Sequence, residues 1–160
     1  MPLARSLIWD SVLHLIIHHV APWDLDEVLV ASGLAVGPCQ RMDQFGIEKV
    51  LSGSKSAEVK NILKRMASEG RVGQSLGWGF YRYSAGGGVL TDPLVDDLIS
   101  EEARFAKIER VEITDEALVV SMKNACKQVE EQLASQGFSA PDIQHGMTDV
   151  LSCPSASWWR

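Results

Sequence analysis

The chain has 160 residues, and its 15 Lys and Arg against 21 Asp and Glu give a formal net charge of −6. This length is that of one ordinary domain or of two very small ones. The acidic balance argues against a nucleic-acid partner, because few cations are available to neutralise phosphates. The N-terminal apolar segment is broken by Trp9-Asp10-Ser11 and by three histidines, so we expect neither a membrane-spanning helix nor a signal peptide.

The cysteines and histidines form no recognisable metal or disulfide motif. The three cysteines include no C-x-x-C pair, which favours free thiols in a reducing cytoplasm over a disulfide framework or a zinc site. They are Cys39, Cys126 and Cys153. His14 and His18 have the i, i+4 spacing that places two imidazoles on one helix face, but no H-E-x-x-H motif and no evident third ligand accompanies them. We therefore expect histidines that lie on a helix surface or are partly packed, and no metal site.

Helical periodicity dominates the first half of the chain. Apolar residues recur every three or four positions from Leu3 to Val20, which predicts a first helix. Asp24 and Asp26 are expected at the start of a second helix, which ends near Ser32. Two further helices are expected, one from Pro38 to an interruption at Gly46 and one from a cap at Ser56 to Gly70.

Glycines punctuate the stretch from Gly73 to Tyr83, which reads GQSLGWGFYRY and predicts a short strand or an extended loop. Ser84 to Gly88 is the most flexible-looking segment and the best candidate for a linker. We therefore expect a first helical repeat over residues 1–84, which contains the G-x-G-F-Y-x-Y segment. Residues 85–160 would hold the linker and a second, partly degenerate helical repeat.

Three more helices are predicted in the second half. Thr91 or Asp92 opens the first of them, with Leu94, Leu98 and Phe105 on one side. The other two run from Thr114 to Gly137 and from Ser139 to about Leu151. The tail ends in Trp158-Trp159, and because two exposed indoles would be an apolar liability, we expect them to dock on this domain or on a partner chain.

A weak internal repeat relates the two halves. Ala21-Pro22-Trp23-Asp24 parallels Ser139-Ala140-Pro141-Asp142 with the proline displaced by one position, and each segment follows a long helix. Asp142 is accordingly interpreted as a helix-start residue, like Asp24. Two such hairpins packed on each other bury a core that neither buries alone. The predicted fold class is all-α, built from two tandem helical repeats.

Four motifs follow one another in the first half: Pro22-Trp-Asp-Leu-Asp26, Gly33-Leu-Ala-Val-Gly37-Pro38, Met42-Asp-Gln-Phe-Gly46 and the glycine-rich stretch from Gly70 to Tyr83. In this order they resemble the C-terminal helical domain of the 3-hydroxyacyl-CoA dehydrogenases. The resemblance is to the form carried by the multifunctional fatty-acid oxidation proteins, in which two helical repeats follow each other. It extends over residues 3–151 and is most specific from Gly70 to Tyr83, where glycines in register are followed by Gly-Phe-Tyr-x-Tyr.

The resemblance implies a part in fatty-acid β-oxidation, where the family moves a hydride between a 3-hydroxyacyl-CoA and NAD. The family's NAD-binding half precedes this domain, carries G-x-G-x-x-G and supplies the catalytic His and Glu, and no such motif occurs in this sequence. We therefore expect no catalytic and no cofactor-binding residue in this chain. NAD is implied only for a missing partner domain, and oxidation of the substrate only in its company.

Several positions depart from the family pattern. The family's active-site Asn is matched by Ala4, its Lys or Thr in the glycine-rich stretch by Ser75, and its Asn-Glu-Ala segment by Asn124-Ala125-Cys126. Ala4 offers no hydrogen bond to a substrate. These departures leave an alternative open, a non-catalytic dimeric scaffold or an acyl-CoA-binding module.

By resemblance, this domain forms one wall of the acyl-CoA cleft. The candidate wall residues are Gly37, Pro38, Met42, Phe45, Gly79, Phe80 and Tyr81. The alternative interpretation makes Gly37-Pro38 a packing turn, and Phe80, Tyr81 and Tyr83 core aromatics. Arg71 and Arg82 offer cations to a CoA phosphate, but a solvated surface pair is favoured. The expected partners are a second copy of the chain, a separate NAD-binding domain and acyl-CoA.

Overall fold

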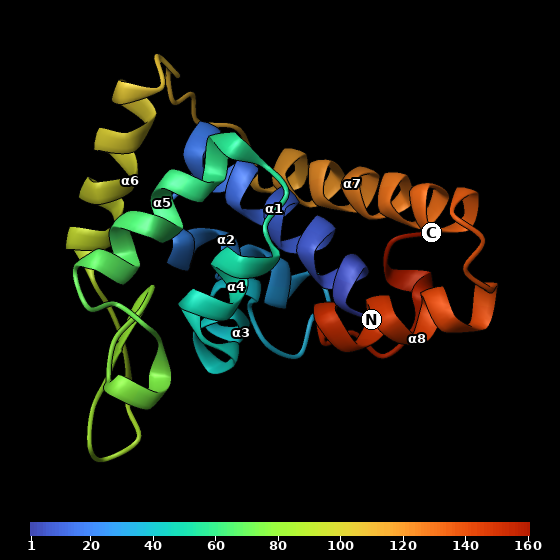
Figure 1. The fold of residues 1–160 in the computed structure, drawn as a ribbon, viewed down its shortest axis with the longest axis horizontal. Coiled ribbons are helices and arrows are strands. Elements are labelled where there is room, and N and C mark those ends of the chain that lie inside the picture. The colour runs from blue at the N-terminus through green and yellow to red at the C-terminus, as the bar shows by residue number, and fades with distance from the viewer.

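The computed structural model describes residues 1–160, and it confirms the predicted all-α class, with eight α-helices and one small hairpin (Figure 1). The helices are α1 (Pro2–His18), α2 (Pro22–Ala31), α3 (Pro38–Phe45), α4 (Ile47–Gly53), α5 (Ala57–Ser68), α6 (Pro93–Phe105), α7 (Asp115–Ser135) and α8 (Ala140–Leu151). Short 3-10 turns at Gln74–Leu76 and Ala156–Trp158 complete the list. None of the helices combines the length and apolar character that crossing a membrane requires.

Helix α1 forms the centre of the molecule, with α7 and α8 on one side and α3, α4, α5 and α6 on others (Figure 1). The predicted stripe contains Ile8, Val12 and Ile16, which are buried. The buried face of α1 is wider than the predicted apolar stripe, however, because Trp9 and Leu13 are also buried. A helix that is apolar around most of its circumference belongs in the interior of a bundle, and α1 occupies that place.

The two long helices are packed across the two halves of the chain. Helix α1 contacts both α7 and α8, while α7 contacts α2 in return. Each long helix therefore packs on the long helix and the following short helix of the other half. This arrangement is how two helical hairpins bury a shared core.

Side-chain caps begin three of the helices where the sequence predicts them. Thr114 accepts a hydrogen bond from the Ala117 N–H at 3.1 Å, and Ser139 accepts one from the Asp142 N–H at 3.3 Å. Asp92 accepts one from the Leu94 N–H at 3.2 Å. Such caps satisfy backbone donors that have no partner inside the helix.

The expected cap at Ser56 is wrong in its chemistry. The Ser56 side chain makes no capping bond, and its N–H donates to Asp10 Oδ2 on α1 at 3.1 Å. The same carboxylate accepts from the Lys55 N–H at 2.7 Å and from Ser54 Oγ at 2.6 Å. Asp10 therefore fixes the turn before α5 from a helix more than forty residues earlier, a contact that local sequence patterns do not reveal.

The glycine-rich stretch leads into an antiparallel hairpin of β1 (Tyr81–Tyr83) and β2 (Val89–Thr91), which extends away from the helices (Figure 1). Tyr81 pairs with Thr91 and Tyr83 with Val89. The expected linker, residues 84–88, is the turn of this hairpin. The division of the chain at residue 84 stays a prediction, and it falls inside a hydrogen-bonded turn.

Two helices differ from the sequence prediction. Helix α4 lies where no separate helix was expected, and it contributes buried Ile47 and Val50 to the core. On α6, Leu98 is buried as predicted, but Leu94 and Phe105 are 55% and 71% exposed. The buried side of α6 consists of Val95, Leu98, Ile99 and Ala103. Both faces satisfy helical spacing, and packing against α1 and α5 selects the second one.

The C-terminal indoles dock on this domain, which was one of the two expected positions. Trp159 is fully buried, and its Nε1–H donates to Glu130 Oε2 of α7 at 3.0 Å. The Nε1–H of Trp158 donates to the Ser32 carbonyl at 3.0 Å. The tail therefore closes the end of the bundle between α2 and α7.

Candidate functional site

Two buried aspartates hold the family-like motifs of the first half together. Asp26 lies on α2, is 5% exposed and accepts hydrogen bonds from the N–H groups of Cys39 at 2.9 Å and Gln40 at 3.0 Å. Tyr81 donates its hydroxyl to Asp26 Oδ2 at 2.8 Å. Asp26 was expected to serve the start of its own helix. Its side chain instead caps α3, which begins one residue after Gly37.

Asp43 repeats this arrangement one helix later. It lies on α3, is 1% exposed and accepts from the Phe80 N–H at 2.8 Å and the Tyr81 N–H at 3.0 Å. Tyr83 donates its hydroxyl to Asp43 Oδ2 at 2.7 Å. Helices α2 and α3 and strand β1 are therefore joined by one hydrogen-bonded chain of two carboxylates and two phenols.

Each aspartate is packed against a glycine. A Cβ on Gly37 would overlap the Asp26 side chain, and a Cβ on Gly79 would overlap the Asp43 carboxyl group. Neither glycine has a positive φ. Their requirement is for space rather than for an unusual backbone, which explains two glycines of the sequence motifs in physical terms.

Burial and hydrogen bonding act on these carboxylates in opposite directions. Burial raises the pKa of Asp26, although three hydrogen bonds favour its charged form. Burial raises the pKa of Asp43 to about 6, although hydrogen bonds from Phe80, Tyr83 and Tyr81 lower it. Burial also raises the pKa of the two tyrosines, so the phenols stay neutral donors.

The interpretation of Arg71 and Arg82 as a solvated pair is wrong for Arg71. Arg71 is 2% exposed, and its Nη1 lies 2.8 Å from Asp92 Oδ2. Its guanidinium also stacks on Trp78, with 4.4 Å between the group and the ring centre. Arg82 is half exposed, with its Nε 3.0 Å from the same Asp92 oxygen. Burial opposes ionisation of Asp92, but the bonds from both arginines outweigh it and lower its pKa.

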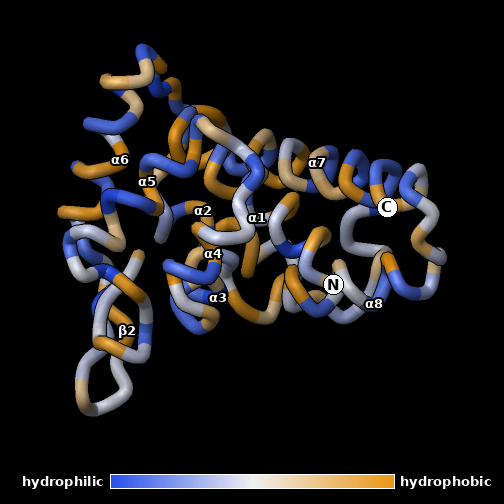
Figure 2. Tube along the Cα trace, viewed as in Figure 1, coloured by the Kyte–Doolittle hydropathy of each residue, from blue (hydrophilic) through white to orange (hydrophobic).

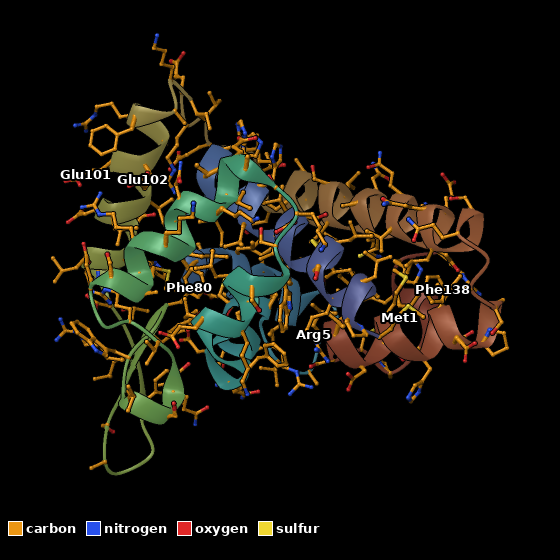
Figure 3. The ribbon with its side chains drawn as sticks, viewed as in Figure 1. Met1, Arg5, Phe80, Glu101, Glu102 and Phe138 are labelled. Carbon is orange, nitrogen blue, oxygen red and sulfur yellow. The ribbon has the colours of Figure 1, made fainter.

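Six of the seven predicted wall residues lie inside this buried unit. Gly37, Pro38, Met42, Gly79, Phe80 and Tyr81 are buried, and Figure 3 labels Phe80 where the hairpin meets the helices. Phe45 differs, because it is half-buried and packs edge-on against Trp9 with 5.0 Å between ring centres. Their role as a substrate wall stays a prediction, and six of them would act through the shape of the buried unit.

Phe45 lines a hollow of about 280 Å³ between α1 and α4. Two cations and one carboxylate line the hollow, Arg5, Lys49 and Asp10, and the Arg5 guanidinium lies 4.3 Å and Lys49 Nζ 5.7 Å from the Phe45 ring centre. Trp9 completes the aromatic side. Arg5, Trp9 and Lys49 were not among the predicted wall residues, because the first two lie on α1 and the third on α4, and only packing brings α1 to Phe45.

A larger hollow of about 620 Å³ lies between α2 and the segment before α7. Its charged side chains are mostly acidic: Asp24, Glu27, Asp96, Glu112 and Asp115 against Arg110. Arg110 donates a hydrogen bond to Asp96 at 2.9 Å, and this ion pair neutralises the positive charge of Arg110. Because phosphates would be repelled here, this hollow is not suited to coenzyme A.

The residues of this chain do not fit NAD. Dinucleotide sites are built on a parallel sheet with a glycine-rich strand-to-helix turn, whereas this chain has one antiparallel two-stranded hairpin. The Asp26 and Asp43 carboxylates are enclosed by their hydrogen-bond donors, and the absence of a catalytic residue from this chain stays a prediction.

The structure adds a third group to the histidines of α1. Glu58, in the first turn of α5, lies beside both His14 and His18. The sequence offered no third ligand because α5 approaches α1 only in the folded chain.

Comparisons with known proteins place this chain beside 3-hydroxyacyl-CoA dehydrogenases in sequence and in fold. Residues 5–83 match the 3-hydroxyacyl-CoA dehydrogenase, C-terminal domain family. A peroxisomal fatty acid beta-oxidation multifunctional protein of Oryza sativa subsp. japonica is 33% identical over 92 residues, which are 52% of this chain and 12% of that protein. The fold matches the crystal structure of the dehydrogenase part of multifunctional enzyme 1 from C. elegans, with a TM-score of 0.68 and 20% identity over 92% of this chain and 35% of that one.

The chain thus spans a small part of the relatives it matches, and the match confirms the resemblance carried by its motifs. The matched segment is the one that Asp26 and Asp43 tie together. Residues 5–83, about half of the chain, thus belong to the family of 3-hydroxyacyl-CoA dehydrogenase C-terminal domains.

Proposed function

We propose that this chain is the acyl-CoA-wall domain of an NAD-linked 3-hydroxyacyl-CoA dehydrogenase of fatty-acid β-oxidation. The observation that carries the proposal is that, within the family-matched residues 5–83, the hydrogen bonds of Asp26 and Asp43 join α2, α3 and β1 into one unit. A wall whose shape is fixed by such bonds lowers the cost of ordering a long, flexible substrate.

In this proposal, the oxidation itself needs a second part. A hydride passes from the 3-hydroxyl carbon of the acyl-CoA to NAD, and the partner part holds the NAD and the base that takes the hydroxyl proton. The present chain supplies no catalytic residue and no NAD contact. Its own contribution is the hollow beside Phe45, where Arg5 and Lys49 offer positive charge to the phosphates of coenzyme A.

Reconstitution tests the proposal. The purified chain is mixed with an NAD-binding part of the family expressed without its own helical domain, and oxidation of NADH is followed with acetoacetyl-CoA as substrate. We expect activity that neither part has alone, and a loss of affinity for acetoacetyl-CoA with Arg5→Ala. Gly86→Ala, in the open turn of the hairpin, serves as the matched control. No activity at high concentration of both parts would contradict the proposal.

A second candidate function is a homodimeric scaffold. Leu94 and Phe105 lie eleven positions apart, three helical turns, so they share one face of α6. Both are exposed, as is Leu90 of the adjacent strand β2, and Figure 2 shows hydrophobic segments along α6. Sedimentation of the chain and of Phe105→Ser tests this candidate. A dimer that Phe105→Ser dissociates supports it, and a monomer at all concentrations contradicts it.

Calorimetry with acyl-CoA esters separates a scaffold from a ligand-binding module, since only the second releases heat.

The compartment proposed for the chain is the reducing cytoplasm, supported by three buried and unpaired cysteines. Imaging of a fluorescent fusion tests the location, with the peroxisome of the rice relative as the competing outcome.

A further inference from the structure

Three metal-binding side chains converge on one side of the molecule, between α1 and α5. His14 and His18 lie one turn apart on α1, with 4.2 Å between their ring centres. Glu58 approaches from α5, with Oε1 2.5 Å from His18 Nε2 and Oε2 3.7 Å from His14 Nδ1. The three ligand atoms all lie within 4.8 Å of one another.

The cluster is accessible and lacks a competing cation. The side chains of His14, His18 and Glu58 are 55%, 27% and 35% exposed, so an ion could enter from solvent. Both ion pairs of Glu58 are to these histidines, with no lysine or arginine in contact.

We propose that His14, His18 and Glu58 bind one divalent transition-metal ion of the zinc class and thereby join α1 to α5. Ligand atoms around a tetrahedral ion at ~2.0–2.1 Å lie about 3.3 Å apart. The two imidazole–carboxylate distances bracket this value, at 3.7 Å to Oε2 of Glu58 and 2.5 Å to its Oε1. With one ligand atom from each residue, all separations are within 4.8 Å, so side-chain rotation is enough to bring the three atoms around one ion.

The ligand set selects the kind of ion. Two imidazoles and one carboxylate suit Zn²⁺, Ni²⁺, Cu²⁺ or Co²⁺, whereas Mg²⁺ and Ca²⁺ prefer oxygen ligands alone. Three protein ligands leave a coordination position for water or a solute. A hollow of about 570 Å³, lined by His14, Asp10 and His19, lies next to this position.

Titration calorimetry of the full, tag-free chain with ZnCl₂ tests the site. We expect one ion per chain, and affinity reduced at least about tenfold by His14→Ala and by Glu58→Gln, because each removes a ligand. His145→Ala and Glu131→Gln are matched controls, because both positions are exposed and lie on α8 and α7, away from the cluster. Circular dichroism of each variant verifies that the chain is folded.

Two further readouts make the result specific. The midpoint of thermal unfolding should rise with saturating Zn²⁺ in the original chain and not in Glu58→Gln, since an ion that binds only the folded state stabilises it. Visible absorption of Co²⁺ should show a tetrahedral spectrum without the intense thiolate band that cysteine ligands would give. Absence of saturable binding at millimolar Zn²⁺, binding unchanged by Glu58→Gln, or a thiolate band would each overturn the proposal.

Discussion

Replacing Gly79 with alanine is expected to destabilise the fold through a single contact. The φ of Gly79 lies outside the left-handed region, so alanine brings no backbone strain there. The added Cβ would overlap the Asp43 carboxyl, which has no room to move because it is buried and bonded to Phe80, Tyr81 and Tyr83. Any relief must therefore stretch or break these hydrogen bonds.

The expected loss can be worked out from these contacts. Overpacking a close-packed site costs about 1–3 kcal/mol, and weakening one hydrogen bond to a buried carboxylate adds about 1.5 kcal/mol. Gly79→Ala should therefore reduce the free energy of unfolding by about 2.5–4.5 kcal/mol. Gly86→Ala, in the turn of the same hairpin, meets open space and should change it by less than about 0.5 kcal/mol.

Urea unfolding followed by circular dichroism measures these differences, and a double-mutant cycle isolates the contact. Asp43→Ala removes the carboxyl atoms that the new Cβ meets, so in that background Gly79→Ala should cost about 2 kcal/mol less than in the original chain. Equal stability of Gly79→Ala and Gly86→Ala, or strictly additive losses in the double variant, would refute the steric explanation.

Three other predictions concern buried groups. Arg71→Met leaves Asp92 with only the half-exposed Arg82, and urea unfolding should show a loss of about 2–4 kcal/mol; a loss below about 1 kcal/mol would contradict the burial of the pair. The pKa of the Asp43 carboxyl is about 6 in the folded chain, against an ordinary value of 3.8, so the folded state binds the carboxyl proton more tightly than the unfolded state does. The free energy of unfolding should therefore fall as the pH rises from 3.8 to 6, by up to about 1.4 kcal/mol per pH unit. Urea titrations at several pH values should show that Asp43→Asn removes this component, and an unchanged slope would argue against it. Trp159→Ala empties a fully buried site and should cost about 3–5 kcal/mol in the same assay, and a near-neutral effect would mean that the tail is peripheral.

Local patterns predicted the elements whose signals are local. The caps at Thr114 and Ser139 and the prolines at helix starts identified helix beginnings, because capping depends on residues within one turn. The apolar periodicity of α1 was equally clear. The predicted face of α6 was wrong, since two overlapping apolar stripes satisfy one helical period and only the neighbours α1 and α5 distinguish them.

The anchoring carboxylates show where sequence reasoning stops. Asp26 follows a proline-marked turn and matches the pattern of a helix-start residue, yet its partners lie at Cys39, Gln40 and Tyr81. Glu58 likewise looks like an ordinary acidic residue in a first turn until α5 packs beside α1. Composition gave no sign of either role, because both depend on contacts between residues far apart in sequence.

The central position of α1 has a consequence for how the chain acquires its fold. Helix α1 is synthesised well before α7 and α8, the two helices that cover one side of it. At about 5–20 residues per second, its buried leucines and isoleucines stay uncovered for several seconds on the ribosome. Nascent chains that stall before α7 should therefore recruit chaperones or aggregate, and folding should be slow for a helical protein because its decisive contacts close the longest loop.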